Sequence, residues 1–301
     1  MSNKFISWLI FILLCFIWGS SFILMKWGMY GANGKLVLSP FDVAAVRLLS
    51  AGIVMLPFLR NSLKNLSKKI ILYILLSGWI GSFFPAILFC IAETKIDSGL
   101  TACLNSLTPL FVIISGVVLF KLETSRQKIL GVIIGILGSV LLFRANNSPI
   151  SYVAYGGFVI LATFLYGINV NMVYKTLAEV PSMQIATIAF TGLIPPSLIV
   201  LFITGYFKLP LIEHSYALST IASSILGIGG TALASVLFYI LVKKAGGLFA
   251  SLVTYGIPFI AILWGIYYGE KISWLHIVSL LIILGGVYLS TRQEKKQQTA
   301  Q

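Results

Sequence analysis

The stretch DSGLTACLNSLTPLFVIISGVVLFKLE, residues 97–123, determines how the rest of this chain is organised. It is a long apolar run with Pro109 near its middle and Glu123 at its end. A similar pattern returns half a chain later as GLFASLVTYGIPFIAILWGIYYGE, residues 247–270, with Pro258 in the middle. An apolar helix that is interrupted by proline at the same place in both halves is typical of a membrane protein built from two related units.

The composition is that of a protein with many membrane-spanning helices. Of its 301 residues, 58% are hydrophobic and only 10% are charged, whereas soluble domains carry about 25% charged residues. The net charge of +13 would indicate a nucleic-acid partner in a soluble protein. Here the basic residues are spread over loops between apolar runs, so they indicate membrane orientation instead. We therefore expect the lipid bilayer and a small-molecule substrate as partners, and no nucleic acid; the oligomeric state stays open.

Ten apolar segments are each near the roughly 20 residues that a helix needs to cross a bilayer. Their ranges are 7–27, 40–59, 70–92, 97–120, 127–144, 152–174, 183–204, 216–241, 247–268 and 272–291. The predicted fold class is therefore an all-α polytopic membrane protein with ten transmembrane helices. The first segment has no small-residue cleavage site, so we interpret it as a retained helix rather than a signal peptide.

The lysines and arginines predict that both termini are cytoplasmic. With the N-terminus inside, 14 of them fall on inside segments and 6 on outside ends and loops, while Arg47 lies within a helix. Basic residues are enriched in cytoplasmic loops, which favours this orientation.

The internal repeat extends beyond the proline segments. Gly78 and Gly81 recur 149 residues later as Gly227 and Gly230. Each half holds five helices, an odd number, so the halves must be inverted relative to each other. The predicted domains are repeat 1 at 7–144, repeat 2 at 152–291 and a cytoplasmic tail at 292–301.

The sequence lacks the patterns of an enzyme or a metal protein. The three cysteines have no metal or redox spacing, and no phosphate-binding loop or nucleophile elbow is present. We expect no catalytic residue, no metal and no cofactor. None of the eight acidic residues falls in the middle of a segment, so no central carboxylate relay is expected. A neutral, zwitterionic or amphipathic solute suits such a cavity; an intramembrane enzyme and a channel remain alternatives.

Polar residues beside the two prolines are the first candidates for a substrate site. In each half they recur at helical spacing on one face, and a proline inside a membrane helix usually faces protein or a wet cavity. For a single Ser or Thr, a role in helix packing is the favoured interpretation; for Asn105 and the two stripes together, we favour a cavity lining. These candidates are Thr101, Asn105, Thr108, Pro109, Ser251, Thr254, Tyr255 and Pro258.

The first helix of each half supplies the second group of candidates. Trp18 and Ser21 share a face with Met25 in the first segment, and Tyr166 and Asn169 share a face in the sixth. For the aromatic residues, ordinary packing is the alternative. Further candidates are Trp79, Phe83, Thr231, Ser235 and Tyr239.

Two cations are expected on the outer side. Arg47 lies roughly 10 Å along the second segment from Pro40. The favoured interpretation is structural: Arg47 reaches the outer surface or binds carbonyls of a neighbouring helix. The alternative is that it binds a carboxylate of the solute. Lys26 is expected to extend to the interface, or to attract anions there.

The motifs together resemble a known family. Trp18-Gly19-Ser20-Ser21-Phe22 is similar to its opening motif, Val46-Arg47-Leu48-Leu49-Ser50-Ala51 is similar to its second-helix motif, and the proline–glutamate–glycine pattern occurs twice. This resembles the EamA family of the drug/metabolite transporter superfamily, from about Trp8 to Leu289. The charged run at 93–97 departs from the family's pattern.

The resemblance implies a ten-helix carrier of the bacterial inner membrane, often an exporter of amino acids or related metabolites. The expected function is secondary-active efflux of small amphipathic metabolites by alternating access. A permease for drugs, or for nucleoside or sugar-type metabolites, is the alternative.

Overall fold

The computed structural model describes residues 3–31, 34–123, 125–145, 150–269 and 273–291, which form helices and no strand. Two short 3-10 helices (η1, η3) and two π-helical turns (η2, η4) interrupt the α-helices. In chain order the elements are α1 Asn3–Tyr30, α2 Pro40–Met55, η1 Leu56–Phe58, α3 Leu59–Ser62, α4 Lys68–Gly78, η2 Trp79–Phe83, α5 Phe84–Ala92, α6 Ser98–Asn105, α7 Thr108–Phe120, α8 Arg126–Ala145, α9 Ile150–Lys175, α10 Ser182–Thr191, α11 Ile194–Ile203, η3 Tyr206–Lys208, α12 His214–Ile225, η4 Leu226–Leu233, α13 Ala234–Ala245, α14 Gly247–Ser251, α15 Val253–Tyr267 and α16 Trp274–Thr291.

Eight helical stretches of the described chain are long and apolar enough to cross a membrane. They overlap eight of the expected segments and confirm a polytopic all-helical membrane protein. The other two segments correspond to α8, which begins with basic residues, and α16, whose apolar part Trp274–Gly286 is shorter. The ten-helix count therefore stays a prediction. The eight stretches are Phe5–Tyr30, Pro40–Ser62, Lys68–Ala92, Ser98–Phe120, Tyr152–Lys175, Ser182–Ile203, His214–Ala245 and Gly247–Tyr267.

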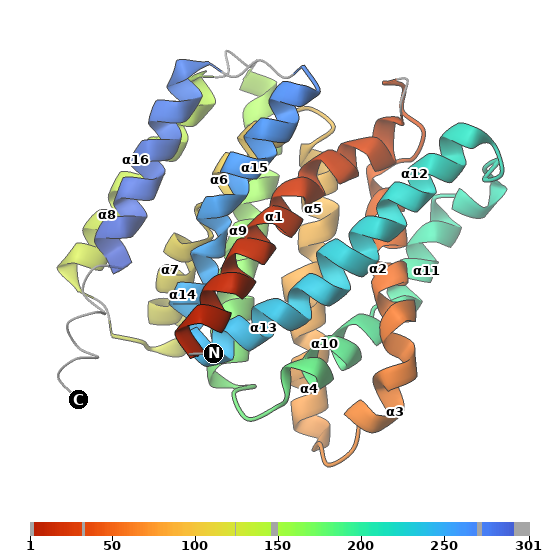
Figure 1. Cartoon of the computed structure of the whole chain (residues 1–301), viewed down its shortest axis with the longest axis horizontal. Helices are drawn as coiled ribbons and strands as arrows, with labels where there is room; N and C mark the ends of the chain where they lie inside the picture. Colours follow the sequence, from red (N-terminus) through yellow and green to blue (C-terminus); the bar gives the residue numbers. More distant parts are fainter. Residues whose placement is uncertain (1–2, 32–33, 124, 146–149, 270–272, 292–301) are drawn as a thin grey trace.

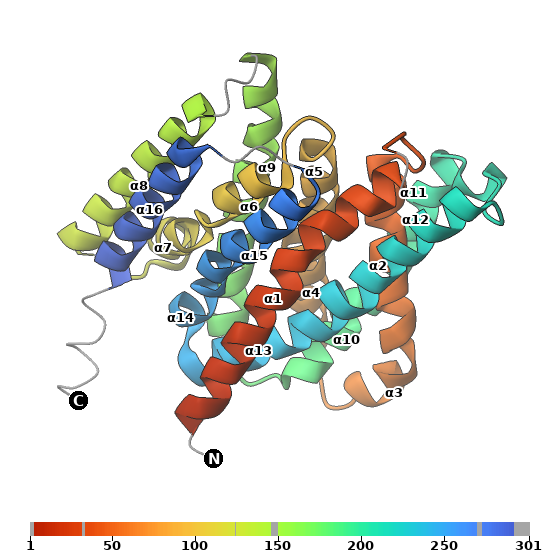
Figure 2. The same cartoon turned by 45° about the horizontal axis from the view of Figure 1, so that its top comes forward.

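Helices from the two halves of the chain are interlocked. α1 packs against α15, and α9 packs against α7, so an early helix of each half contacts the proline segment of the other. Figure 1 shows α1 and α15 next to each other, while α8 and α16 form a separate pair at one edge. The pair stays side by side in the turned view of Figure 2. The expected tail, 292–301, lies outside the described residues.

Two glycines allow the closest of these crossings. A Cβ atom on Gly19 would lie 2.5 Å from Cβ of Ile260 in α15, and one on Gly167 would lie 2.6 Å from the carbonyl carbon of Phe111 in α7. Small residues let membrane helices approach to backbone contact, where packing contributes most to their association. The glycines at these positions therefore set the distance between the two halves.

The segments that cross the centre are not regular helices. The third expected segment contains the π-helical turn η2, and the eighth contains η4. When the repeat spacing of 149 residues is added to the bounds of η2, it gives residues 228–232. These residues lie inside η4. The two proline segments are also divided, between α6 and α7 and between α14 and α15. Such turns change the direction of the backbone and occur often at functional sites.

Replacing Gly167 by alanine should destabilise the protein by about 1–3 kcal/mol, because the new methyl group meets the backbone of α7, which cannot move aside cheaply. Thermal unfolding of the purified protein in detergent measures this. Gly157→Ala is the matched control in the same helix, since no atom lies within 4 Å of its added Cβ. Equal melting temperatures for the two variants would contradict the assigned α7–α9 contact.

Candidate functional site

A cavity of about 100 Å³ lies where the interrupted helices meet. Its wall combines aromatic rings with hydroxyl and amide groups, and Arg47 is the charged side chain among the described residues that line it. Both halves of the chain contribute to the wall. The lining residues are Trp18, Ser21, Phe22, Met25, Arg47, Gly81, Ser82, Phe89, Asn105, Thr108, Tyr166, Asn169, Val170, Gly230, Thr231, Ser235, Phe238, Tyr239, Ser251, Thr254 and Ile257.

The break between α6 and α7 brings Asn105 and Thr108 to this wall. Pro109 has no N–H, so it cannot donate the helical hydrogen bond to the carbonyl of Asn105. The hydroxyl of Thr108 donates to that carbonyl instead, at 2.7 Å. Thr108 and Asn105 are both buried. The hydroxyl thus satisfies a carbonyl that the proline leaves free, in a place where water is scarce.

The same break removes Thr101 from the site. The expectation that Thr101 and Thr108 share one face assumed a continuous helix, and the chain leaves the helix after Asn105. The Thr101 hydroxyl donates to the carbonyl of Asp97 at 2.9 Å and does not line the cavity.

In the second half, Ser251 and Thr254 line the cavity, while Tyr255 and Pro258 do not. Here the helix is divided at Leu252, and Pro258 lies inside α15. The Thr254 hydroxyl donates to the carbonyl of Ser251 at 2.7 Å, across the division. The buried hydroxyl of Tyr255 has no hydrogen-bond partner among the described residues.

α1 meets the π-helical turn η4 at the cavity. The indole Nε1 of Trp18 donates to the carbonyl of Gly230 at 2.9 Å, and its ring lies against Phe238 with the centroids 5.1 Å apart. Gly230 also leaves room for Ser21, whose Oγ would lie 2.8 Å from a Cβ added there. Trp18 therefore has both roles that the sequence left open, because it packs between helices and lines the cavity.

α9 meets the first π-helical turn, η2, in a similar way. The side chain of Asn169 fills the space beside Gly81, where an added Cβ would collide with it. Asn169 Oδ1 accepts a hydrogen bond from Ser77 at 2.5 Å. Tyr166 stacks on Phe89, with the ring centroids 5.8 Å apart. Both predicted residues of the sixth segment thus line the cavity.

Arg47 lies in the cavity wall and not at the outer surface. Arg47 is only 9% exposed. Its Nε donates to the hydroxyl of Thr231 at 2.6 Å, and its Nη1 lies 3.7 Å from the sulfur of Met25. The expected extension to the surface is therefore wrong. The reason is that Gly227 lets η4 approach the backbone of α2 closely at Arg47, which leaves the guanidinium facing inward.

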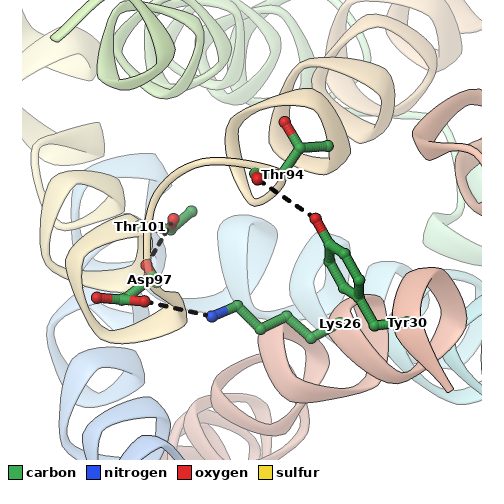
Figure 3. Close-up of polar contacts among 5 residues, drawn as sticks. All are labelled: Lys26, Tyr30, Thr94, Asp97 and Thr101. Carbon is green, nitrogen blue, oxygen red and sulfur yellow. Dashed lines mark hydrogen bonds and ion pairs between the residues drawn. The ribbon is translucent and has the colours of Figure 1, made fainter. Parts of the chain in front are cut away.

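Lys26 lies outside the cavity, where the end of α1 meets the turn before α6. Its ammonium is 3.6 Å from Asp97, and the two side chains are 22% and 50% exposed. Nearby, Tyr30 donates to the carbonyl of Thr94 at 3.3 Å. Figure 3 shows the Lys26–Asp97 pair and the Tyr30–Thr94 hydrogen bond close together at the end of α1. The ion pair reduces the capacity of Lys26 to attract anions.

The structure thus brings most of the expected site residues together and leaves five outside the lining. Those inside are Trp18, Ser21, Arg47, Asn105, Thr108, Tyr166, Asn169, Ser251 and Thr254; those outside are Lys26, Thr101, Pro109, Tyr255 and Pro258. Of the further candidates, Thr231, Ser235 and Tyr239 line the cavity, whereas Trp79 and Phe83 do not.

The lining residues that the sequence did not indicate are mainly apolar or glycine. The repeated glycines did carry a signal, since Gly81 and Gly230 stand 149 positions apart and both line the cavity. Met25 also lies on the α1 face that carries Trp18 and Ser21. The same spacing of 149 residues relates Ser82 to Thr231 and Phe89 to Phe238, and Phe22 belongs to the motif at 18–22. No sequence pattern distinguished Val170 and Ile257.

The fold and the cavity define a class: a multi-pass helical membrane protein with an internal cavity. The EamA-like transporter family matches residues 6–144 and 155–292. The chain therefore belongs to the EamA-like transporter family, which confirms the resemblance seen in the sequence. Family membership identifies a membrane transporter and points away from an enzyme.

Two individual proteins are similar to this chain, one in sequence and one in fold. An uncharacterized transporter of Archaeoglobus fulgidus is 25% identical over 152 residues, which cover 49% of this chain and 51% of that protein. The match thus spans about half the length of this relative. A crystal structure with 18% sequence identity superposes with a TM-score of 0.65 and covers 96% of this chain and 98% of the other. At that identity the likeness concerns the fold alone.

Thr108→Val should lower the free energy of unfolding by about 1 kcal/mol, because the carbonyl of Asn105 loses its donor. Thr101→Val is the matched control. The carbonyl of Asp97 also accepts the backbone N–H of Thr101 at 2.9 Å, so it keeps a partner. Thermal unfolding in detergent compares the two variants, and a loss as large in Thr101→Val as in Thr108→Val would refute this role.

Asp97→Asn should change the free energy of unfolding by less than about 1 kcal/mol, because the Lys26–Asp97 pair is partly exposed and screened by solvent. Melting temperatures at low and high salt test this. The small difference between wild type and variant should shrink further as salt rises. A large difference that persists in high salt would show that the pair is structurally essential.

Proposed function

We propose that this protein is a secondary-active carrier that exports small amphipathic metabolites, such as amino acids or related solutes, by alternating access to the cavity described above. The observation that carries the proposal is the composition of the cavity wall. Both halves of the chain contribute hydroxyl groups, amides and aromatic rings to one cavity. Such sites, largely apolar with a few placed polar groups, are typical of small-molecule binding.

The proposed architecture has ten transmembrane helices in two inverted repeats, 7–144 and 152–291, with both termini in the cytoplasm. Several paired features support it. The π-helical turns η2 and η4 stand at matching places in the two halves, and each proline segment is divided near the cavity. Inverted repeats commonly place the substrate at their interface, next to interrupted helices.

The interlocked packing favours a rocking motion of one helix group against another. α1 contacts α15 and α9 contacts α7, at Gly19 and Gly167 respectively. These crossings lie beside the cavity-lining residues Trp18 and Tyr166. A small rotation at either crossing would widen one end of the cavity and narrow the other, which is what a carrier requires.

The proposed location is the cell (inner) membrane, where the protein is multi-pass. The part of the cavity wall that the structure describes includes no acidic side chain, so the proposal invokes no carboxylate relay at the centre. Two other functions are distinguished by experiment. A channel would give flux without saturation or counterflow, and a permease for drugs or for nucleoside or sugar-type metabolites would enrich those solutes outside cells.

Asn105→Leu should abolish most of the transport, because it removes an amide from the cavity wall. Cells that produce wild type should accumulate one group of metabolites in the medium, and the variant should reduce that accumulation by about tenfold at equal membrane abundance. Untargeted metabolite analysis of the medium measures this. Asn61→Leu, the same change at an exposed position of α3, is the matched control and should retain export.

Counterflow in reconstituted vesicles then tests the carrier mechanism with the solute so identified. Preloaded unlabelled solute should accelerate uptake of labelled solute by wild type and by Asn61→Leu. If the media of wild-type and Asn105→Leu cultures match, and vesicles show no counterflow with any metabolite extract, the proposed export function is wrong.

A further inference from the structure

Among the described residues, the cavity wall contains a cation and no anion. Arg47 lines it, and the described lining residues include no aspartate or glutamate. Among the described residues, Arg47 forms no ion pair; its contacts are a hydroxyl and a thioether. Placing a charge at membrane depth is costly unless it is paired or hydrated. Among the described lining residues, Arg47 thus supplies the charge that a solute in the cavity would meet.

The contacts of the guanidinium leave one edge free. Nε donates to Thr231, whose hydroxyl in turn donates to the carbonyl of Leu226 at 3.2 Å. Nη1 faces the sulfur of Met25, a weak acceptor. Nη2 has no hydrogen-bond partner among the described residues. The Nε contact fixes the orientation of the group, and the Nη1–Nη2 edge retains the paired donors that bind a carboxylate with two parallel hydrogen bonds.

We propose that Arg47 binds a carboxylate of the transported solute, so that the substrates are small monocarboxylates with an apolar or aromatic body. The inference rests on the proposed transport function and specifies its substrate class. One cation balances one negative charge, which disfavours a phosphate ester carrying about −1.5 to −2. Trp18, Phe89 and Phe238 line the same cavity and offer apolar surface for the rest of the solute.

The geometry also separates this role from a purely structural one. A structural arginine that only joined α2 to η4 would need the Nε–Thr231 hydrogen bond and nothing more. An arginine that binds a carboxylate needs its charge and the paired donors of Nη1 and Nη2. It needs the hydrogen bond to Thr231 only to orient the guanidinium. Substitutions at the two positions therefore give different results under the two roles.

Ligand-dependent thermal stabilisation of the purified protein tests the inference directly. The probes are acetate, butyrate, 3-phenylpropionate and L-phenylalanine, each compared with its amide at the same concentration. We expect one or more carboxylates to raise the melting temperature, with the larger apolar bodies binding better, and the matching amides to have little effect. Stabilisation by amides equal to that by carboxylates, or no stabilisation by any carboxylate, would overturn the proposal.

Variants then assign the effect to Arg47. Arg47→Gln should weaken carboxylate binding by about a hundredfold, and Arg47→Lys by about tenfold because it keeps the charge but loses the fork. Thr231→Val should retain binding within about tenfold. Arg60→Gln, at an exposed position, is the matched control and should bind as wild type does. If Arg47→Gln fails to fold, Arg47→Lys and Thr231→Val still distinguish the two roles. A structural role predicts that carboxylate binding weakens more in Thr231→Val than in Arg47→Lys, and a binding role predicts the reverse.

Flux measurements in vesicles distinguish this inference from the proposed function. Carboxylate-specific binding that depends on Arg47, without counterflow of the bound probe, would support the binding site and contradict transport. Counterflow that is equal for a carboxylate and its amide, and unchanged in Arg47→Lys, would support transport and refute the assignment of Arg47.

Discussion

Backbone carbonyls that lose their helical donors inside a membrane must find other donors, and this requirement shapes the centre of the protein. Thr108 donates to the carbonyl that Pro109 leaves free, Trp18 donates to a carbonyl of the π-helical turn η4, and Thr231 donates to Leu226 in the same turn. These three donors also line the cavity. The same side chains therefore stabilise the irregular backbone and form the wall that a solute would meet.

The sequence predicted the fold class because its signals are local. Apolar length, clustered charges and the repeated proline segments are all visible in one dimension, and the structure and the family assignment agree with them. Glycine pairs such as Gly81 and Gly230 were visible too, although their spacing indicated a repeat and not a cavity. Their place at the π-helical turns depends on how α1 and α9 pack, which no single segment encodes.

The site was predicted less completely, for physical reasons that differ between residues. Thr101 and Tyr255 were assigned by helical periodicity, which fails where the chain leaves the helix near Asn105 and Leu252. Arg47 was expected to reach the outer surface because a single membrane helix, considered alone, offers no other position where its charge meets water. Close approach of η4 at Gly227 and the hydroxyl of Thr231 hold it inside instead. Tertiary contacts thus decided these positions.

Alternating access of the cavity is the central claim, and cysteine labelling from the two sides of a membrane tests it most directly. The native cysteines are buried at Cys15, Cys90 and Cys103, so Ser235→Cys would place a reporter in the cavity wall. A membrane-impermeant maleimide should label this cysteine from either face of oriented vesicles, and transported solute should change both rates. Labelling from a single face, unaffected by any transported solute, would contradict the account.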